Sequence, residues 1–285
     1  MKNEYIHTYE ESEQQRLVAQ AEFLAPYTHP FLSFEPTDSI LEIGCGVGAQ
    51  MKIILEKRKL KKLTGIDLEP KQIEKANTLL YNQINQGKVE LTVGSGINLP
   101  YADGSFDVVY IFFVLEHFID PKSILKEIKR VLKPNGKFYC TEVFNAGTYI
   151  YPDNPFLVNY WKKFNDLQTA IGGNPHIGIE LSNLCIDSGF IIDKFVSTAP
   201  LLDKRMIDST ERKQFLNMWE TLFLSGYSML YDRGIINKED NKLVSLEFEK
   251  ILVNPNSIFL YTCWQVLAIN QMEQTDELPY GDWKD

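Results

Sequence analysis

The stretch SILEIGCGVGAQ, residues 39–50, places three glycines at alternate positions directly after a short apolar run. This order predicts a strand over 39–43, a tight turn over 44–48 and a helix over 49–57. The missing side chains of such a turn let a ligand approach the backbone, and the helix that follows offers unpaired N–H groups. The stretch therefore predicts a ligand-binding strand–turn–helix unit that opens an α/β domain.

Two ligands fit these letters. The run from Gly44 to Ala49 satisfies the dinucleotide pattern G-x-G-x-x-G/A, and the run from Glu42 satisfies an acid-x-G-x-G-x-G pattern. Asp67 ends the next predicted strand about 20 residues later, where a carboxylate accepts hydrogen bonds from ribose hydroxyls. NAD and S-adenosylmethionine (SAM) both carry an adenosine, so this much leaves them tied. Glu42 favours SAM, because that position is normally apolar in a dinucleotide fold.

Strands and helices alternate along the first half of the chain. We predict further strands at 62–66, 89–93, 106–112 and 137–143, with helices at 71–81 and 121–132. Strands spaced by helices of this length form right-handed βαβ units in a parallel sheet. Residues 146–175 are aromatic and irregular. They are followed by predicted helices at 177–188, 208–232 and 238–252 and by strands at 190–197 and 258–269.

Composition limits the classes of function. The chain has 285 residues, 44% of them hydrophobic, and a net charge of −9, which argues against nucleic-acid binding as its main task. The longest apolar run, 108–115, is far shorter than the roughly 20 residues of a membrane-spanning helix. The start shows no secretory pattern. We expect a cytoplasmic protein whose four scattered cysteines are buried free thiols: Cys45, Cys140, Cys185 and Cys263.

The second half of the predicted sheet resembles a known family. VGSGINLPYADGSFDVVYIFFVLEHF (93–118) resembles a block of class I SAM-dependent methyltransferases, in which a loop meets adenine and L-P-x-x-D-x-S-F-D-V-V leads into the fourth strand. LKEIKRVLKPNGKFY (125–139) and IGIELSNLCIDSGF (177–190) are similar to later blocks of that family. The resemblance is strongest over 38–143 and points to small-molecule enzymes similar to quinone- and sterol-methylating ones.

The resemblance implies an α/β fold with a Rossmann-like, seven-stranded, mostly parallel sheet, the last strand antiparallel, helices on both faces, and a helical cap. It divides the chain into four parts. These are an N-terminal lid helix region (1–37), a SAM-binding core (38–145), a helical cap insertion with the terminal strands of the same sheet (146–271), and a polar tail (272–285).

It also implies roles for matching positions. The methionyl part of SAM is expected along Gly44, Cys45 and Gly46, the ribose at Asp67, and the adenine against Leu68. The remaining expected contacts are Ser95, Gly96 and Ile97 at the adenine edge, and Phe112 and Tyr9 at the methionine end. The family often has an acid where Ser95 stands. A neutral hydroxyl accepts a weaker hydrogen bond, so adenine recognition here is expected to lean on the backbone.

Methyl transfer from a sulfonium is an in-line displacement, so the protein aligns the acceptor, excludes water and, where needed, removes a proton. His117 is the candidate base, and Glu116 is expected to orient it or to bind a substrate amine. Arg16 is expected to pair with a neighbouring glutamate at the surface. Candidate acceptor-pocket residues are Tyr151, Tyr160, Trp161 and His176. No HExxH or Cys/His cluster indicates a metal, and Asp103 and Asp107 look like turn and strand-entry residues.

The expected function is methyl transfer from SAM to a small, fairly apolar metabolite at O, N or C, with S-adenosylhomocysteine as product. A SAM-fold cyclase, or another SAM-binding enzyme that transfers no methyl group, stays open. An NAD-dependent oxidoreductase and a non-enzymatic adaptor are more remote. The expected partner is a small-molecule substrate, with neither nucleic acid nor membrane. A homo-oligomer stays open, with the N-terminal helix packed across two copies.

Overall fold

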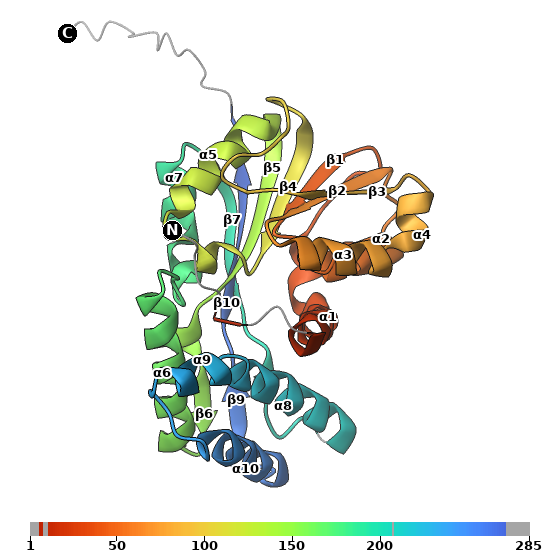
Figure 1. Cartoon of the computed structure of the whole chain (residues 1–285). Helices are drawn as coiled ribbons and strands as arrows, with labels where there is room; N and C mark the ends of the chain where they lie inside the picture. Colours follow the sequence, from red (N-terminus) through yellow and green to blue (C-terminus); the bar gives the residue numbers. More distant parts are fainter. Residues whose placement is uncertain (1–5, 8–10, 207, 272–285) are drawn as a thin grey trace, which may run out of the picture.

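The computed structural model describes residues 6–7, 11–206 and 208–271. Its centre is a seven-stranded sheet in the order β3-β2-β1-β4-β5-β10-β7 (Figure 1). The strands are β1 (Ser39–Ile43), β2 (Lys62–Asp67), β3 (Val89–Val93), β4 (Phe106–Phe112), β5 (Leu132–Val143), β7 (Ile191–Thr198) and β10 (Cys263–Ile269). β1 to β5 pair in parallel, and β10 runs antiparallel between β5 and β7. The predicted Rossmann-like sheet with an antiparallel last strand is confirmed.

Helices cover both faces of this sheet, as the alternation along β4 requires. Val108 and Tyr110 pack on the side of α2 (Ala49–Lys57) and α3 (Pro70–Leu79). Val109 and Ile111 pack on the side of α5 (Pro121–Val131) and α7 (Leu181–Asp187). The chain order reverses between β1 and β4. In α/β sheets, ligands bind beyond the carboxyl ends of the strands at such a point.

The predicted helix 71–81 is wrong in its extent. It divides into α3 and α4 (Tyr81–Asn85) at Leu80, whose φ of −105° and ψ of 15° leave the helical range. Leu80 is fully buried, and a Cβ at Gly48 would lie 2.7 Å from its Cδ1. Packing of Leu80 against the glycine turn therefore accompanies the break.

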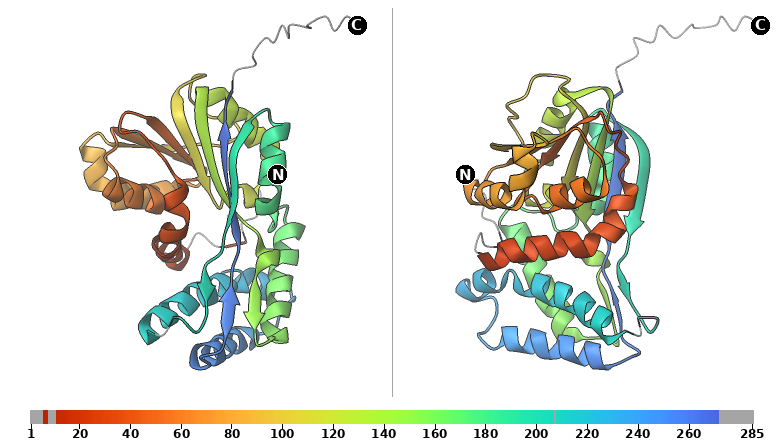
Figure 2. Two further views of the ribbon diagram at one scale, coloured as in Figure 1. Left: turned by 180° about the vertical axis from the view of Figure 1, so that it is seen from behind. Right: turned by 90° about the vertical axis from the view of Figure 1, so that its right-hand side faces the viewer.

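A second, three-stranded sheet lies beneath the first in the order β6 (Tyr149–Tyr151), β9 (Ile258–Leu260), β8 (Leu201–Leu202). It repeats the order β5-β10-β7, because each of its strands adjoins one of those three along the chain (Figure 2). The prediction of one strand over 258–269 is therefore wrong. The run breaks at Tyr261 and Thr262. The Tyr261 hydroxyl donates to Asn145 Oδ1 (2.9 Å) and Phe144 N–H donates to the Thr262 carbonyl (3.1 Å).

Four helices pack with the small sheet: α6 (Pro155–Ala170), α8 (Ser209–Leu224), α9 (Tyr227–Asp232) and α10 (Asp240–Val253). The prediction that 146–175 is irregular is wrong, since it contains β6 and α6. Asn154 Oδ1 caps α6 by accepting from Leu157 N–H (3.0 Å), and Pro155 occupies the first turn. The predicted helix 208–232 breaks between α8 and α9 at Gly226, where a Cβ would lie 2.6 Å from Phe164 Cε2.

The N-terminal helix α1 (Glu11–Thr28) lies between α2 above and α8 below (Figures 1 and 2). Its Ala21 and Ala25 pack against Val47 and Ala49 at the glycine turn. Among the helices in the described part of the chain, none is long and apolar enough to cross a membrane. The division into four parts stays a prediction.

Candidate functional site

The glycine turn is tied to the end of β2. Gly44 and Cys45 both donate N–H groups to the Ile66 carbonyl, at 2.8 and 3.1 Å. Gly44 has φ +70°, and a Cβ there would lie 2.5 Å from Val114 Cγ2. Gly46 differs, because a Cβ there would meet no atom of the described residues within 4 Å. The turn is thus closely packed at Gly44 and open at Gly46, where a ligand can approach the backbone.

Asp67 lies beside that open position. Its Oδ2 accepts from Gly46 N–H (2.8 Å) and its Oδ1 from Glu69 N–H (2.9 Å), while burial raises the pKa of its carboxyl. Leu68, the next residue, is 69% exposed, and Ile97, on the loop after β3, is 51% exposed. Ser95 Oγ in that loop accepts from Ile97 N–H (3.4 Å). A carboxylate with exposed apolar side chains nearby suits a nucleoside, which has hydroxyls and an aromatic ring.

Glu42 lies inside the sheet at the register of Tyr110 on β4. It is 2% exposed, and the Tyr110 hydroxyl donates to its Oε2 at 2.6 Å. Burial, with the nearby Asp67 charge, raises the pKa of Glu42 to about 8. The tyrosine therefore orients the Glu42 carboxyl within the sheet, and a direct contact between Glu42 and a ligand stays a prediction.

A small, partly open cavity of about 40 Å³ lies where the N-terminal residues, the loop after β4 and the cap meet. Its walls include His7, Arg16, Phe113, Glu116, His117 and Trp161. Val114, in the same loop, is the side chain that contacts Gly44. The cavity therefore adjoins the glycine turn at the carboxyl end of β4.

Glu116 and His117 share this cavity but differ in electrostatics. Glu116 Oε2 accepts from Gln168 Nε2 (2.7 Å), and its Oε1 lies 3.7 Å from His117 Nε2. Burial raises the pKa of Glu116 to about 7. Burial, with the charge of Arg16, lowers the pKa of His117 to about 3. An effective general base has a pKa near the working pH, so the opposite pKa shifts of these two cavity residues favour Glu116 over His117 as proton acceptor.

Two N-terminal residues close the cavity. Arg16 pairs with Glu13 through two bonds of 2.7 Å and also donates to Gln20; the predicted pairing with a glutamate is therefore present, but in the interior rather than at the surface. His7 Nδ1 lies 2.7 Å from Ser225 Oγ, and its ring stands edge-on to His117 with centroids 6.0 Å apart. Burial, Arg16 and His117 lower the pKa of His7. No local sequence pattern marked His7.

Several predicted residues lie away from this cavity. Phe112 packs near His29 on the α2 side, with ring centroids 5.7 Å apart, and Phe113 at φ +57° lines the cavity instead. Of the predicted acceptor-pocket residues, Trp161 lines it and three do not. Tyr151 is exposed on β6, Tyr160 stacks on Phe223, and His176 packs on Phe144. Tyr9 lies outside the described residues.

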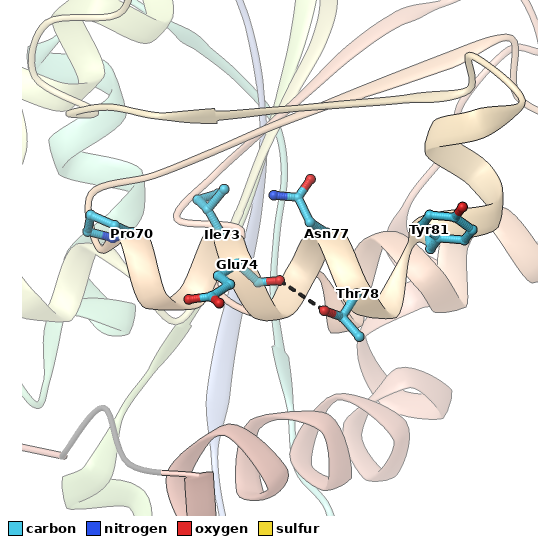
Figure 3. A pocket seen from close by; sticks show the side chains of 6 residues that line it. All are labelled: Pro70, Ile73, Glu74, Asn77, Thr78 and Tyr81. Carbon is cyan, nitrogen blue, oxygen red and sulfur yellow. Dashed lines mark hydrogen bonds between the residues drawn. The ribbon is translucent and has the colours of Figure 1, made fainter.

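A larger hollow of about 660 Å³ follows α3 (Figure 3). All of its lining residues come from α3 or the first residue of α4: Pro70, Ile73, Glu74, Asn77, Thr78 and Tyr81. Five of the six are exposed, and the Thr78 hydroxyl donates a hydrogen bond to the Glu74 carbonyl (3.2 Å). A surface hollow walled by one helical edge brings no reactive groups together, so the smaller cavity is the better candidate.

Within residues 6–7, 11–206 and 208–271, no group of three or more His, Cys, Asp or Glu residues could hold a metal ion. All four cysteines are free and buried. Asp103 forms an ion pair with Arg130 (2.8 Å), and Asp107 accepts from Ser39 N–H (2.9 Å) at the strand entry.

Comparison with known proteins agrees with this geometry. Residues 41–140 match the family model of a methyltransferase domain. The chain is 33% identical over 149 residues to a demethylmenaquinone methyltransferase of Lactobacillus johnsonii, covering 50% of this chain and 58% of that protein. It is 31% identical over 132 residues to a sterol 4-C-methyltransferase of Caenorhabditis elegans, covering 46% and 38%. The alignments thus span about half the length of such curated relatives, or less.

Solved structures extend the likeness to the whole fold. The structure of the [4+2]-cyclase SpnF superposes with a TM-score of 0.55 at 18% identity, covering 93% of this chain and 85% of that one. At this identity the likeness shows the fold alone. The chain therefore resembles class I SAM-dependent methyltransferases in its core, and shares its architecture with a protein of different activity.

Proposed function

We propose that the protein is a SAM-dependent methyltransferase that methylates a small molecule at O, N or C. The observation that carries the proposal is the match of residues 41–140 to a methyltransferase domain. That segment supplies both the turn at Gly44–Gly46 and Glu116. The cap and N-terminal residues complete the second half of the site.

The residues around the turn fit SAM. Gly46 leaves its backbone open, Asp67 offers a carboxylate to ribose hydroxyls, and Leu68 and Ile97 expose apolar surface for an adenine ring. We assign the methionyl part to Gly44, Cys45 and Gly46, and the adenine edge to Ser95 and Gly96. When bound, SAM supplies an activated methyl group. The chain itself has to place the acceptor in line with that group and keep water out.

The cavity at Glu116 would receive the reacting end of the acceptor, because its volume of about 40 Å³ holds no more than a few atoms. Phe113, Trp161, Phe164 and Leu222 give it apolar walls, while Glu116 and Arg16 make it partly polar. We assign proton removal to Glu116 Oε1, with Oε2 held by Gln168, and leave His117 a neutral neighbour. The net charge of −9 and the buried thiols support a cytoplasmic protein without a nucleic-acid partner.

Calorimetry with S-adenosylhomocysteine tests the proposal. We expect saturable binding by the full chain and no competition from NAD. Absence of binding to folded protein would refute SAM as the ligand. Incubation with methyl-labelled SAM and a pooled small-metabolite extract then separates transfer from cyclisation, since a cyclase gives an unlabelled product.

A further inference from the structure

Glu142, near the end of β5, is a buried carboxylate that the proposed mechanism has not used. It is 0% exposed, and its Oε1 accepts from Val114 N–H (2.8 Å) and Leu115 N–H (2.7 Å). Its Oε2 has no hydrogen-bond partner among the described residues. Burial and the charge of Glu116 raise the pKa of Glu142. Burying an acid with one unpaired oxygen costs free energy, so the presence of Glu142 at this position requires an explanation.

The turn that Glu142 holds is strained. Phe113 begins it at φ +57°, a conformation that a bulky side chain rarely adopts. Phe113, Glu116 and His117 all line the cavity, so the strained turn presents three wall residues at once. Strain of this kind persists only where the surroundings over-determine the backbone.

The backbone and side chain of Glu116 are fixed by contacts on several sides. The Glu116 carbonyl accepts from Asn174 N–H (2.7 Å), its carboxyl accepts from Gln168, and a Cβ at Gly173 would lie 2.7 Å from the same carbonyl. Glu142 adds the two bonds that fix the start of the turn. Without an acceptor, the Val114 and Leu115 N–H groups would be left unpaired in the interior.

We propose that Glu142 is a positioning residue for methyl transfer: its carboxylate oxygen fixes the turn 113–117 and thereby holds Glu116 against the acceptor cavity. This inference rests on the proposed function for its purpose. This role requires an acceptor oxygen at the distance from the backbone that a glutamate side chain provides. It does not require that the oxygen be charged.

Two substitutions separate reach from charge. Glu142→Gln keeps the oxygen and removes the charge, whereas Glu142→Asp keeps the charge and shortens the side chain by about 1.5 Å. The readout is the titration of Glu116 in ligand-free, full-length protein, by ¹³C carboxyl NMR, with the resonance assigned by its loss in Glu116→Gln. Other groups around Glu116 are Arg16 from α1, His7, His117 and Tyr261, and both variants leave them in place.

We expect Glu116 to titrate near 7 in the wild type. Glu142→Gln lowers this midpoint only through the lost repulsion between the two carboxylates, which leaves the backbone of the turn and its amide exchange unaltered. In Glu142→Asp the midpoint should fall by at least about one pH unit, because a released turn lets water reach the carboxylate. Amide exchange at Val114 and Leu115 should quicken at least about tenfold in Glu142→Asp and stay near wild type in Glu142→Gln. Glu127→Asp is the matched control, since Glu127 accepts from Leu99 N–H (2.8 Å) elsewhere and should leave Glu116 unchanged.

Unchanged titration and exchange in Glu142→Asp would overturn the proposal, as would amide exchange at Val114 and Leu115 that is equally fast in Glu142→Gln. If Glu142→Asp does not fold, Glu142→Met, which keeps the length and removes the acceptor, replaces it with the same expectations. These measurements use neither SAM nor an acceptor. Failure of S-adenosylhomocysteine binding would therefore refute the proposed function while leaving this result to stand or fall separately.

Discussion

The two halves of the candidate site are built in opposite ways. The glycine-turn side comes from one contiguous part of the chain, 42–97, and exposes Leu68 and Ile97 to solvent. The cavity side is formed by largely buried side chains, and its walls come from positions as far apart as His7 and Tyr261. The residues of a contiguous motif can be identified from the sequence alone. The walls of the cavity come together only when distant segments pack in the folded protein. The comparison predicts that substitutions on the two sides affect different measurements.

The largest expected effect is on the cavity side. Glu116→Gln should lower methyl transfer by about 10²–10⁴-fold, because it removes the proposed proton acceptor, and should leave S-adenosylhomocysteine affinity within about twofold. His117→Ala is the comparison, with a loss of less than about tenfold expected. Labelled-methyl transfer and calorimetry measure the two quantities. A larger loss in His117→Ala than in Glu116→Gln would return the role of base to His117.

The next largest effect is on the pH dependence of stability. It tests whether Glu42, beneath the exposed glycine turn, is shielded from water. The folded-state pKa of Glu42 is about 8, above its ordinary 4.5. Its contribution to stability is therefore fully present below pH 4.5 and is lost as pH rises towards 8, amounting to about 5 kcal/mol. Glu42→Gln should remove this dependence. The free energy of unfolding of the wild type and of Glu42→Gln is measured with denaturant at pH 5 and pH 8.5. Subtracting the change in one protein from that in the other removes the contributions of groups that the two proteins share.

A smaller effect is expected at the packed end of the turn. Gly44→Val should weaken S-adenosylhomocysteine binding by at least about 100-fold, because the new side chain would displace Val114 in a backbone conformation that suits glycine. Gly87→Val is a matched control with the same φ of +70° and no atom of the described residues within 4 Å of its Cβ. Equal losses of binding in both variants would contradict a local role for Gly44.

The smallest expected effect is at the ribose. Asp67→Ala should weaken S-adenosylhomocysteine binding by about 1–3 kcal/mol through lost hydrogen bonds to a charged group. Asp103→Ala, which removes a surface ion pair with Arg130, should change binding little. An unchanged dissociation constant in Asp67→Ala would remove the ribose assignment.

The accuracy of the sequence predictions follows the same division. β1, β3 and β4 have the predicted bounds. β1 and β4 are buried parallel strands, which leave a continuous apolar run between turn residues, whereas β3 is a partly exposed edge strand rich in β-branched residues. α6 was missed although Leu157, Tyr160, Trp161 and Phe164 recur at helical spacing, because the whole segment 146–175 was interpreted as irregular. The break at Tyr261 accompanies its hydrogen bond to Asn145. No local pattern indicates His7. Glu142 had one available signal, an acid within an apolar strand, the same feature that drew attention to Glu42.

The matching order of the two sheets has a consequence for how the cap could change during evolution. Three strands of the large sheet lead within a few residues into the three strands of the small one. The cap is thus continuous with the core. Replacing it as one unit would require new junctions at all three chain connections between the sheets. If the proposed function holds, a change of acceptor is then expected from single substitutions between the two sheets and not from replacement of the whole cap.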